Sequence, residues 1–364
     1  MSEKDAAPGE RPVVVRIPVE PVEAAMEADA RDAALVSSLA VRGPLFGVVA
    51  QSRGDGPLWR VIVEVTRGCP QQARDELNSM LWFKAKDDAK DRTQRRALLA
   101  AVARLETEEV NDLAVLDTRY RVVRAEEYTG MYADGGLELP RPTDPEPVTP
   151  DWDVSPGPAV DDGLVLDPDA PLTPAQAAER LSLRSLAYTG TRYPENVRRD
   201  STRAVETHPD VLLLPVAFTV VESCGDRRWK PGGGLQATAH DARRMLNNSL
   251  TVWEPRLRGL IPLATGLDVD AHSVLAQGGP AAQGVASLAV ASDRLREGRL
   301  DEVEADGTTY RIARIRRLVR WGADGPETPR PSDATTQTPT AIHPRLDEDG
   351  VVHSEEREQE DTAL

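Results

Sequence analysis

Apolar and polar positions along this chain recur with two periods, 3.6 and 2, and their succession predicts helices and strands by turns. Leu77, Met80, Leu81 and Lys84 are spaced i, i+3, i+4 and i+7, which indicates an amphipathic helix. In the first part of the chain we predict a helix over 21–38, strands over 45–50 and 59–65, helices over 70–85 and 93–109, and a hairpin over 113–116 and 119–128.

The same order of elements recurs further along the chain. We predict helices over 173–186 and 194–206, a strand over 211–222, helices over 238–253 and 286–297, and a closing hairpin over 300–305 and 308–321. Thr173 is the expected N-cap of the first of these helices, and Asp306-Gly307 is the expected hairpin turn. The Gly-rich stretch 230–234 shortens the counterpart of the second strand, and 259–284 is expected to form a long loop or a partly disordered lid.

The residues themselves also recur. When the chain is shifted by 190 positions, eleven of the 38 residues from 98 to 135 are identical to their counterparts. These residues are Leu98, Ala101, Arg104, Leu105, Thr118, Tyr120, Arg121, Arg124, Ala133, Asp134 and Gly135. A shift of 169 matches a second set of identical residues, namely Ala73, Arg74, Leu77, Asn78 and Leu81. The sequence therefore predicts two tandem copies of one domain, over residues 14–142 and 173–331.

Each copy combines a β-hairpin, two helices and a closing β-hairpin after an opening helix. This succession predicts an α+β fold with antiparallel sheets that carry helices on one face. Two tandem copies can take the place of a homodimer, so we expect a pseudo-two-fold arrangement in which the two sheets or helical faces pack against each other.

Three further segments lack the pattern of a folded domain. Residues 1–13 are expected to be disordered, and 143–172 forms a linker rich in Pro and Asp, because the stretch 140–174 contains ten prolines. Residues 332–364 are expected to form a disordered acidic tail. Its last twenty residues, 345–364, carry eight acidic and two basic side chains. They contain too few apolar groups to offset the entropy lost when the segment becomes ordered.

Composition narrows the classes of function. The 364 residues include 60 Asp and Glu against 44 Lys and Arg, a net charge of −16, which excludes a generally cationic nucleic-acid coat. No apolar run is long enough to span a membrane, and the charged N-terminus resembles no secretory signal, so we expect a cytoplasmic protein. The two cysteines, Cys69 and Cys224, form neither a disulfide scaffold nor a zinc cluster, and we expect no metal and no cofactor.

Four segments carry a resemblance to a known family. They are Ala-Val-Arg-Gly-Pro-Leu-Phe-Gly at 40–47, Leu-Glu-Thr-Glu-Glu-Val-Asn at 105–111, Pro-Arg-Pro-Thr-Asp-Pro at 140–145 and Asp-Asp-Gly-Leu-Val-Leu-Asp-Pro at 161–168. In these segments the chain resembles an uncharacterised actinobacterial family that is defined as a domain of unknown function. The resemblance covers most of 14–331 and implies an actinobacterial protein. It implies no activity, cofactor or catalytic residue.

Motifs for catalysis are scarce. The sequence has no GxxxxGK[ST] loop, GxGxxG turn, GxSxG elbow or HExxH helix. The tripeptide His208-Pro209-Asp210 matches that of chaperone J-domains, but it leads into a strand and is better explained as a turn. A nucleophile pair of Cys224 or Ser223 with His208 is conceivable but has no counterpart in the first copy.

Two charged clusters remain. Asp161, Asp162, Asp167 and Asp169 could hold a hard cation, although a solvated linker with Asx-turns explains them better. Basic residues recur along 311–320, and alternation places some of them on one face of a strand with an aromatic residue. Such a face could bind nucleic acid or phosphate, or it could keep an edge strand soluble or pair with the acidic tail.

The candidate binding residues are those that the two copies share or that form this basic strand. They are Arg121, Arg124, Tyr310, Arg311, Arg314, Arg316 and Arg320. The preferred hypothesis is a non-catalytic binding, scaffold or regulatory protein with a protein partner. One alternative is a hydrolase or transferase with a cleft between the copies, in which Arg121, Arg311, Asp112 and Glu302 would converge. The other is nucleic-acid or phosphate binding through the basic strand, which the net charge disfavours.

Overall fold

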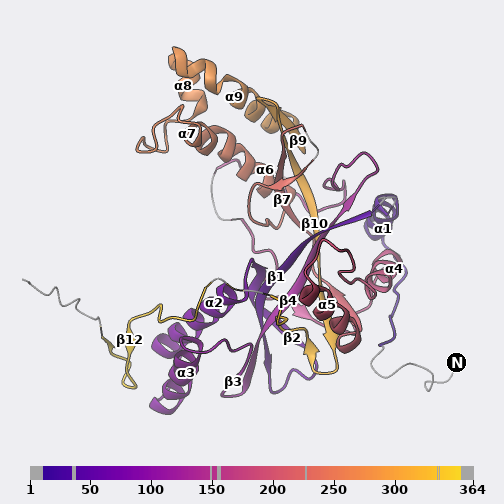
Figure 1. The fold of residues 1–364 in the computed structure, drawn as a ribbon, viewed down its shortest axis with the longest axis vertical. Helices are drawn as coiled ribbons and strands as arrows, with labels where there is room; N and C mark the ends of the chain where they lie inside the picture. The colour runs from indigo at the N-terminus through magenta and orange to yellow at the C-terminus, as the bar shows by residue number, and fades with distance from the viewer. Residues whose placement is uncertain are drawn as a thin grey trace, which may run out of the picture.

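The computed structural model describes residues 11–34, 38–147, 150–153, 157–225, 228–333, 335 and 337–353. Its centre is one antiparallel sheet with the strand order β5-β2-β1-β4-β10-β7-β8 (Figure 1). β3 also pairs with β4, and β6, β9 and β11 pair with β10. The strands of this sheet are β1 (Ser38–Ser52), β2 (Trp59–Arg67), β3 (Asp112–Val115), β4 (Thr118–Met131), β5 (Val165–Leu166), β6 (Asp210–Leu213), β7 (Ala217–Ser223), β8 (Lys230–Pro231), β9 (Glu302–Ala305), β10 (Thr308–Gly322) and β11 (Gly325–Pro326).

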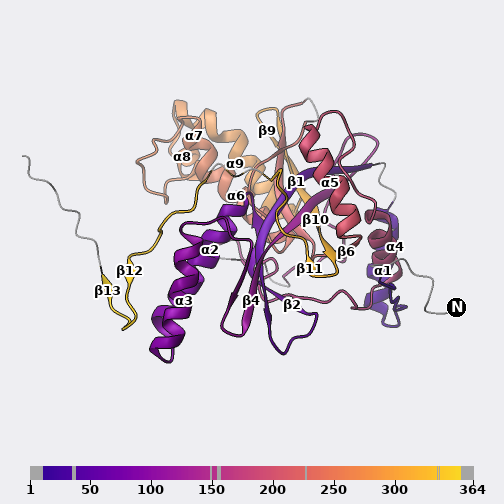
Figure 2. The same ribbon diagram turned by 60° about the horizontal axis from the view of Figure 1, so that its bottom comes forward.

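The helices form three groups around this sheet. The first helical lobe contains α2 (Pro70–Phe83), the π-helical turn η1 (Lys84–Asp88) and α3 (Arg92–Leu105). The second helical lobe contains α6 (Ala239–Asn248), the π-helical turn η2 (Ser249–Trp253), α7 (Glu254–Leu257), α8 (Ala271–Gln277) and α9 (Pro280–Gly298). The third group, α1 (Pro21–Ala33), α4 (Pro174–Leu183) and α5 (Glu195–Thr207), lies on the side away from both lobes (Figure 2).

The two central strands, β4 and β10, pair symmetrically. Glu127 lies opposite Arg317, Tyr128 opposite Arg316 and Glu126 opposite Leu318. The central partners, Glu127 and Arg317, are 190 positions apart, which is the shift that aligns the two halves of the sequence. Because opposed residues share a face, the even-numbered residues of both strands point to the same side of the sheet.

That side carries the helices. Tyr120 and Val122 of β4 pack in one buried cluster with α2 and α3, and Tyr310 and Ile312 of β10 pack in another with α6 and α9. On the opposite side, a third cluster includes Val123 and Val319 and is covered by Leu166 and neighbouring chain rather than by a helix. One face of the sheet therefore bears the helices, as the sequence predicts.

Most predicted elements are confirmed. Thr173 caps α4 through a capping box with Gln176, and the hairpin turn before β10 places Asp306 and Gly307 at φ 50° and 75°. The counterpart of β2 is reduced to β8, as the Gly-rich stretch predicts. The predicted strand over 211–222 instead forms β6 and β7, which are separated at Pro215, because proline has no N–H for the ladder.

The structure corrects three other predictions. The two expected sheets are one, because β4 and β10 pair edge to edge and leave neither strand exposed. The segment 259–284 is not a plain loop: it contains α8, which begins at a capping box formed by Asp270 and Ser273. The linker is not a free spacer, because β5 pairs with β2 and the linker residue Leu166 is buried.

The acidic tail also differs from its prediction. Residues 337–353 include a small hairpin of β12 (Arg345–Leu346) and β13 (Val352–His353), and Leu346 is buried against the first helical lobe. The sequence pattern missed this because a single apolar anchor gives no periodicity. Residues 1–10 and 354–364, for which the sequence predicts disorder, lie outside the described residues.

Candidate functional site

The seven predicted binding residues all lie on the central strands β4 and β10. β10 is paired along both edges, by β6 and β7 on one side and by β4 and β9 on the other, so the hypothesis of a charged edge strand is wrong. Arg314 and Arg320 are buried, and Arg320 donates to the backbone carbonyls of Arg184, Leu186 and His208. The basic strand therefore does not present the open cationic face that binding to nucleic acid would require.

Arg121 and Arg311 occupy similar surroundings at opposite ends of the strand pair. The Arg121 guanidinium lies over the Trp59 ring at 5.1 Å and pairs with Asp112 at 2.6 Å. The Arg311 guanidinium lies over the Trp229 ring at 4.8 Å and pairs with a carboxylate of β9 at 2.5 Å.

Counted outward from the ladder in which Glu127 lies opposite Arg317, these two groups are twelve residues apart along the strands, about 40 Å at 3.3 Å per residue. The carboxylate that pairs with Arg311 belongs to Glu302, which is one of the four residues expected to converge in a cleft. Asp112 and Glu302 each pair with the arginine of their own hairpin, so the predicted catalytic cleft of these four residues is not formed.

Next to the centre of the strand pair, arginines cross over to the opposite half. Arg124 of β4 pairs with Asp333, which follows β11, at 2.8 Å. Arg314 of β10 pairs with Asp144, which follows β4, at 2.9 Å. The backbone repeats this exchange: Arg124 N donates to Glu327 O at 3.0 Å, and Arg314 N donates to Glu138 O at 2.8 Å.

The side around Arg124 is closed. Glu126 accepts from Arg124 at 2.5 Å and from the hydroxyl of Tyr188, which is buried and stacked on Tyr193. Burial has the largest effect on Glu126 and raises its pKa, but Arg124, Arg330 and the Tyr188 hydroxyl together hold that pKa below its usual value. Burial also raises the pKa of Tyr188, so this hydroxyl keeps its proton and stays a donor.

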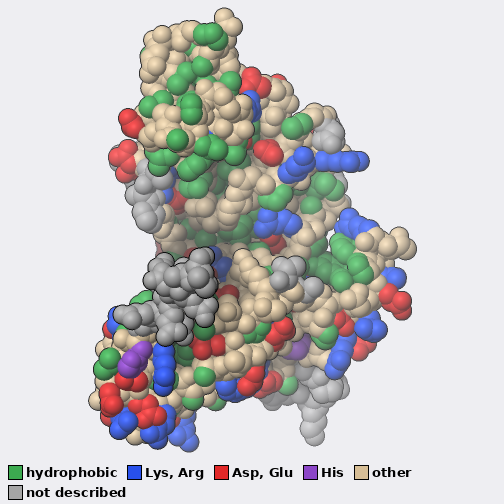
Figure 3. Space-filling view, turned by 60° about the vertical axis from the view of Figure 1, so that its left-hand side comes forward, with side chains coloured by type: hydrophobic (Ala, Val, Ile, Leu, Met, Phe, Trp, Pro, Cys, Tyr) green, Lys and Arg blue, Asp and Glu red, His purple; other side chains and the backbone are tan. Residues whose placement is uncertain are grey.

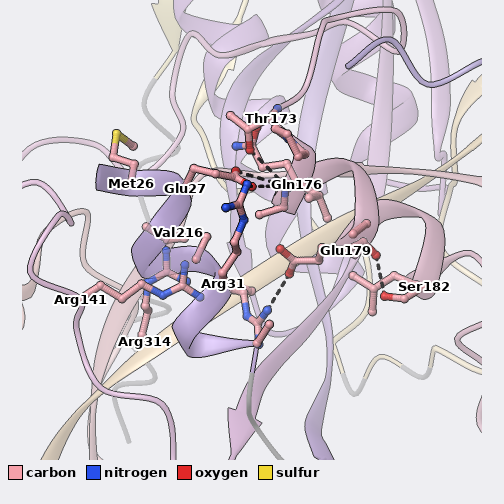
Figure 4. A pocket seen from close by; sticks show the side chains of 18 of the residues that line it. Met26, Glu27, Arg31, Arg141, Thr173, Gln176, Glu179, Ser182, Val216 and Arg314 are labelled. Atoms are coloured by element: carbon pink, nitrogen blue, oxygen red, sulfur yellow. Dashed lines mark hydrogen bonds and ion pairs between the residues drawn. The ribbon is translucent and has the colours of Figure 1, made fainter. Parts of the chain in front are cut away.

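The side around Arg314 is open. A groove of about 670 Å³ lies between α1, α4 and β10, with Arg314 on its floor (Figure 4). Its apolar lining comes from Met26, Ala30, Leu39, Ala178, Leu183, Leu213, Leu214 and Val216. Glu179 of α4 accepts from the Tyr128 hydroxyl at 2.7 Å and from Arg316 at 2.8 Å. The groove thus combines an apolar wall with a floor of paired charges.

Helix α1 forms the outer wall of the groove in an unusual orientation. Its Glu27 is buried and accepts from the N–H of Ala175, in the first turn of α4, at 3.1 Å, where a carboxylate complements the helix dipole. Its apolar residues face outward: Val22 is 71% exposed and Met26 is 50% exposed. The polar face of α1 therefore holds the helix in place, and the apolar face is presented to solvent.

Other candidates from the sequence are accounted for by the fold. His208 lies at the end of α5, where its Nδ1 is 2.9 Å from Thr207 Oγ1, and the Cys224 thiol lies 3.7 Å from Thr308 Oγ1. These contacts do not join a nucleophile to a base. His208-Pro209-Asp210 is the turn between α5 and β6, as expected.

Two of the four linker carboxylates form ion pairs with arginines. Asp161 is buried against Arg317 at 2.6 Å, and Asp169 pairs with Arg11 at 2.8 Å. Among the described residues, no group of His, Cys, Asp or Glu could hold a metal ion. None of the helices in that part of the chain combines the length and hydropathy needed to cross a bilayer.

Sequence reasoning missed several residues of the site. Arg317 was one arginine among five, with no sign that it would be fully buried against the linker carboxylate of Asp161. Glu138 stands just before the Pro-rich stretch and Glu179 stands on a short helix, and carboxylates are ordinary in both places. The repeated Arg-Pro-x-Asp sequence at 141–144 and 330–333 is the signal that could have located Asp144 and Asp333, because each follows a central strand.

Comparison with known proteins adds the family. No curated protein and no solved structure matched the chain. The family of unknown function DUF5954 matches residues 20–336. That span takes in both central strands, the closed side and the groove, and it agrees with the resemblance found in the sequence to a domain of unknown function. The chain belongs to the DUF5954 family.

Proposed function

We propose that this protein is a non-catalytic binding protein, built as a pseudo-dimer within one chain, and that the groove between α1 and α4 receives an apolar segment of a protein partner. The observation that carries the proposal is α1, which turns Val22 and Met26 to solvent beside the groove and keeps Glu27 inside. A surface helix normally buries its apolar face, and an exposed apolar patch next to a cavity is typical of a binding surface.

Equivalent hydrogen bonds support the pseudo-dimer. Val122 N donates to Asn111 O at 2.9 Å, and Ile312 N donates to Asp301 O at 2.8 Å, with 190 positions between the counterparts. Likewise, Thr143 N donates to Asp29 of α1 at 3.0 Å, and Ser332 N donates to Asp200 of α5 at 2.9 Å.

These pairs make α1 the counterpart of α5 and the central strands counterparts of each other. The arginine–aspartate exchange between the halves is the pattern that two subunits of a symmetric dimer would show. A duplicated domain whose two copies stay joined in one chain accounts for all of these pairs.

The charges of the groove support binding rather than catalysis. Arg314 is matched by Asp144 and Glu138, and Arg316 by Glu138 and Glu179, in ion pairs of 2.8–3.2 Å. A general acid or base needs a proton or lone pair directed at the substrate, whereas these groups are engaged with one another. They fix the floor of the groove and leave its apolar wall to contact the ligand.

The size of the exposed surface favours a protein segment over a small metabolite. The cavity alone is within the range of small-molecule sites. The two helices that form its walls, however, expose further apolar side chains: Val22 on α1 is 71% exposed and Leu181 on α4 is 50% exposed. The expected cytoplasmic location and actinobacterial origin stay predictions.

Photocrosslinking in the source cells tests this function. A benzophenone amino acid at Met26 of the full chain is expected to capture one partner, and a benzophenone at Arg199, on the charged outer face of α5, is the matched control. Ala178→Trp, which fills the groove from α4, is expected to abolish the capture at Met26. Equal products from both positions, or capture that survives Ala178→Trp, would exclude the groove as the binding site.

A further inference from the structure

A second surface is covered by the chain itself. The C-terminal segment, residues 337–353, leaves the central sheet and lies across the first helical lobe, α2, η1 and α3 (Figure 1). Cys69 at the start of α2 contacts Gln337, and His343 Nε2 is 2.9 Å from Ser79 Oγ on the same helix. The segment therefore follows α2 from its first residue towards its end.

One ring stack, one hydrogen bond and one buried leucine anchor the segment. The His343 ring stacks on the Trp82 ring at 4.7 Å with an interplanar angle of 16°, and Trp82 Nε1 donates to Pro344 O at 3.1 Å. Two residues further on, Leu346 enters the buried cluster of the lobe. The His343 ring, the Pro344 carbonyl and the Leu346 side chain thus bind one short stretch of chain to the lobe.

A carboxylate completes the contact. Arg96 binds Glu348 with two hydrogen bonds of 2.7 Å, and Arg92 adds one of 3.0 Å. Arg95 donates to the backbone carbonyl of the same residue at 3.1 Å. The side chains of Arg92 and Arg96 are 63% and 66% exposed, so these ion pairs are in contact with water and exchange readily.

The second helical lobe lacks this arrangement. At the counterparts of Arg95 and Arg96, 190 positions later, the sequence has Val285 and Ala286. Figure 3 shows the same contrast: charged side chains of both signs gather on the first lobe, and apolar side chains cover much of the second. The duplicated framework therefore folds without the arginine group, which points to a separate role for it.

We propose that the surface of α2, η1 and α3 is a peptide-binding site that the C-terminal segment fills in cis, and that an acidic segment of a partner protein displaces it. The partner would place an apolar side chain where Leu346 lies and a carboxylate where Glu348 lies. Charge complementarity supports an acidic peptide: Lys86 Nζ lies 5.6 Å from the centre of the Trp82 ring, on which His343 stacks. The eleven residues after His353 add five acidic side chains and one arginine. A covalently attached segment competes at a high effective concentration, which keeps the site closed until a partner is abundant.

The test uses the full-length protein and a fluorescent peptide of residues 340–353. Glu348→Arg in the protein weakens its own segment, so this variant is expected to bind the peptide about tenfold more tightly than the wild type. Glu304→Arg, the same charge change on an exposed residue of β9, is the matched control and is expected to behave as the wild type. A peptide with Leu346→Asp and Glu348→Arg is expected not to bind.

A charge exchange sharpens the result. Adding Arg96→Glu to Glu348→Arg restores an opposite pair in cis, and peptide binding is expected to return to the weak wild-type level. Equal binding by wild type and Glu348→Arg would overturn the proposal, as would a lower midpoint of thermal unfolding without any binding of peptide. A single-stranded oligodeoxythymidine that binds Glu348→Arg more tightly than the peptide would assign the site to nucleic acid instead.

Discussion

The closed side and the groove side of the central strands share one plan of ion pairs and end differently. On both sides an arginine of one strand pairs with the aspartate that follows the other strand, Arg124 with Asp333 and Arg314 with Asp144. The closed side then ends in Tyr188, whereas the groove side ends in an open cavity. A shared framework therefore supports two different surfaces.

One position accounts for much of this difference. Glu126 and Arg316 are counterparts in the predicted repeat, 190 positions apart, and they carry opposite charges. A buried carboxylate can accept a hydroxyl, and Tyr188 supplies it. A guanidinium at the same place needs an acceptor, which Glu179 of α4 provides, and α4 stands far enough from the strands to leave the groove beside it. The two positions thus contact different elements, Tyr188 on the closed side and α4 on the groove side.

The largest expected effect lies at the centre of the comparison. Arg317→Met leaves Asp161 buried and unpaired, because both side chains are fully buried, and is expected to lower the free energy of unfolding by about 3–5 kcal/mol. Glu127→Gln, at the residue opposite, is expected to cost less than about 1 kcal/mol. Burial raises the pKa of Glu127, and its partner Arg42 is half-exposed, so a neutral amide is tolerated there.

Urea unfolding of both variants checks this difference. Equal losses would show that the two sides of the strand pair depend on their central residues in the same way. The double variant Arg317→Met/Asp161→Asn is expected to recover part of the stability, because it removes the unpaired charge.

The next largest effect is expected at Tyr188, the residue that closes one side. Tyr188→Ala removes a buried ring and is expected to cost about 3 kcal/mol, whereas Tyr188→Phe loses only the hydrogen bond to Glu126, about 2 kcal/mol. Tyr128→Phe is the matched change on the groove side and is expected to cost about 1 kcal/mol, because Glu179 is part-exposed and water replaces the hydroxyl. Urea unfolding at neutral pH measures all three, and a smaller loss for Tyr188→Phe than for Tyr128→Phe would contradict the comparison.

The stability contributed by the two sides is also expected to depend differently on pH. The pKa of Glu126 is held below its usual value of 4.5, so the unfolded chain takes up this proton more readily than the folded protein does. Glu126 therefore adds stability above about pH 4.5, and this contribution is lost as the pH falls through the lower, folded-state pKa. Glu126→Gln is expected to flatten the loss of unfolding free energy between about pH 5 and 3.

The groove side has an arginine at this position, so this acid-dependent contribution belongs to the closed side alone. Glu304→Gln, an exposed carboxyl on β9, is the control and is expected to leave the slope unchanged. A Glu126→Gln profile parallel to that of the wild type would show that the carboxylate is not stabilised by its partners.

The order of elements follows from the sequence because periodicity and turn residues act locally. The helix with Leu77 and Leu81, the cap at Thr173 and the turn at Asp306-Gly307 are all determined within a few neighbouring residues. The predicted repeat also indicates which segments correspond. Neither signal shows that β4 and β10 pair with each other, because this pairing depends on residues 190 positions apart.

The site was less predictable for the same reason. Arg314 and Arg316 look like surface charge in the sequence, because their carboxylates come from a Pro-rich segment and from α4. The alternation of β10 places both on one face, but no local pattern shows that this face is buried. Only the tertiary fold turns a basic strand into the paired floor of a groove.

The smallest effect on stability is expected on the outer face of α1. Substitutions there are expected to affect partner binding rather than folding. Val22→Asp and Met26→Asp change side chains that are half or more exposed, so each is expected to alter the free energy of unfolding by less than about 0.5 kcal/mol. Both should abolish crosslinking of the partner from Leu39, at the rim of the same groove. Leu257→Asp, an apolar residue of α7 that is 74% exposed, is the control for stability and should leave capture intact. Equal loss of capture in all three variants would mean that exposed apolar surface in general, and not this groove, recruits the partner.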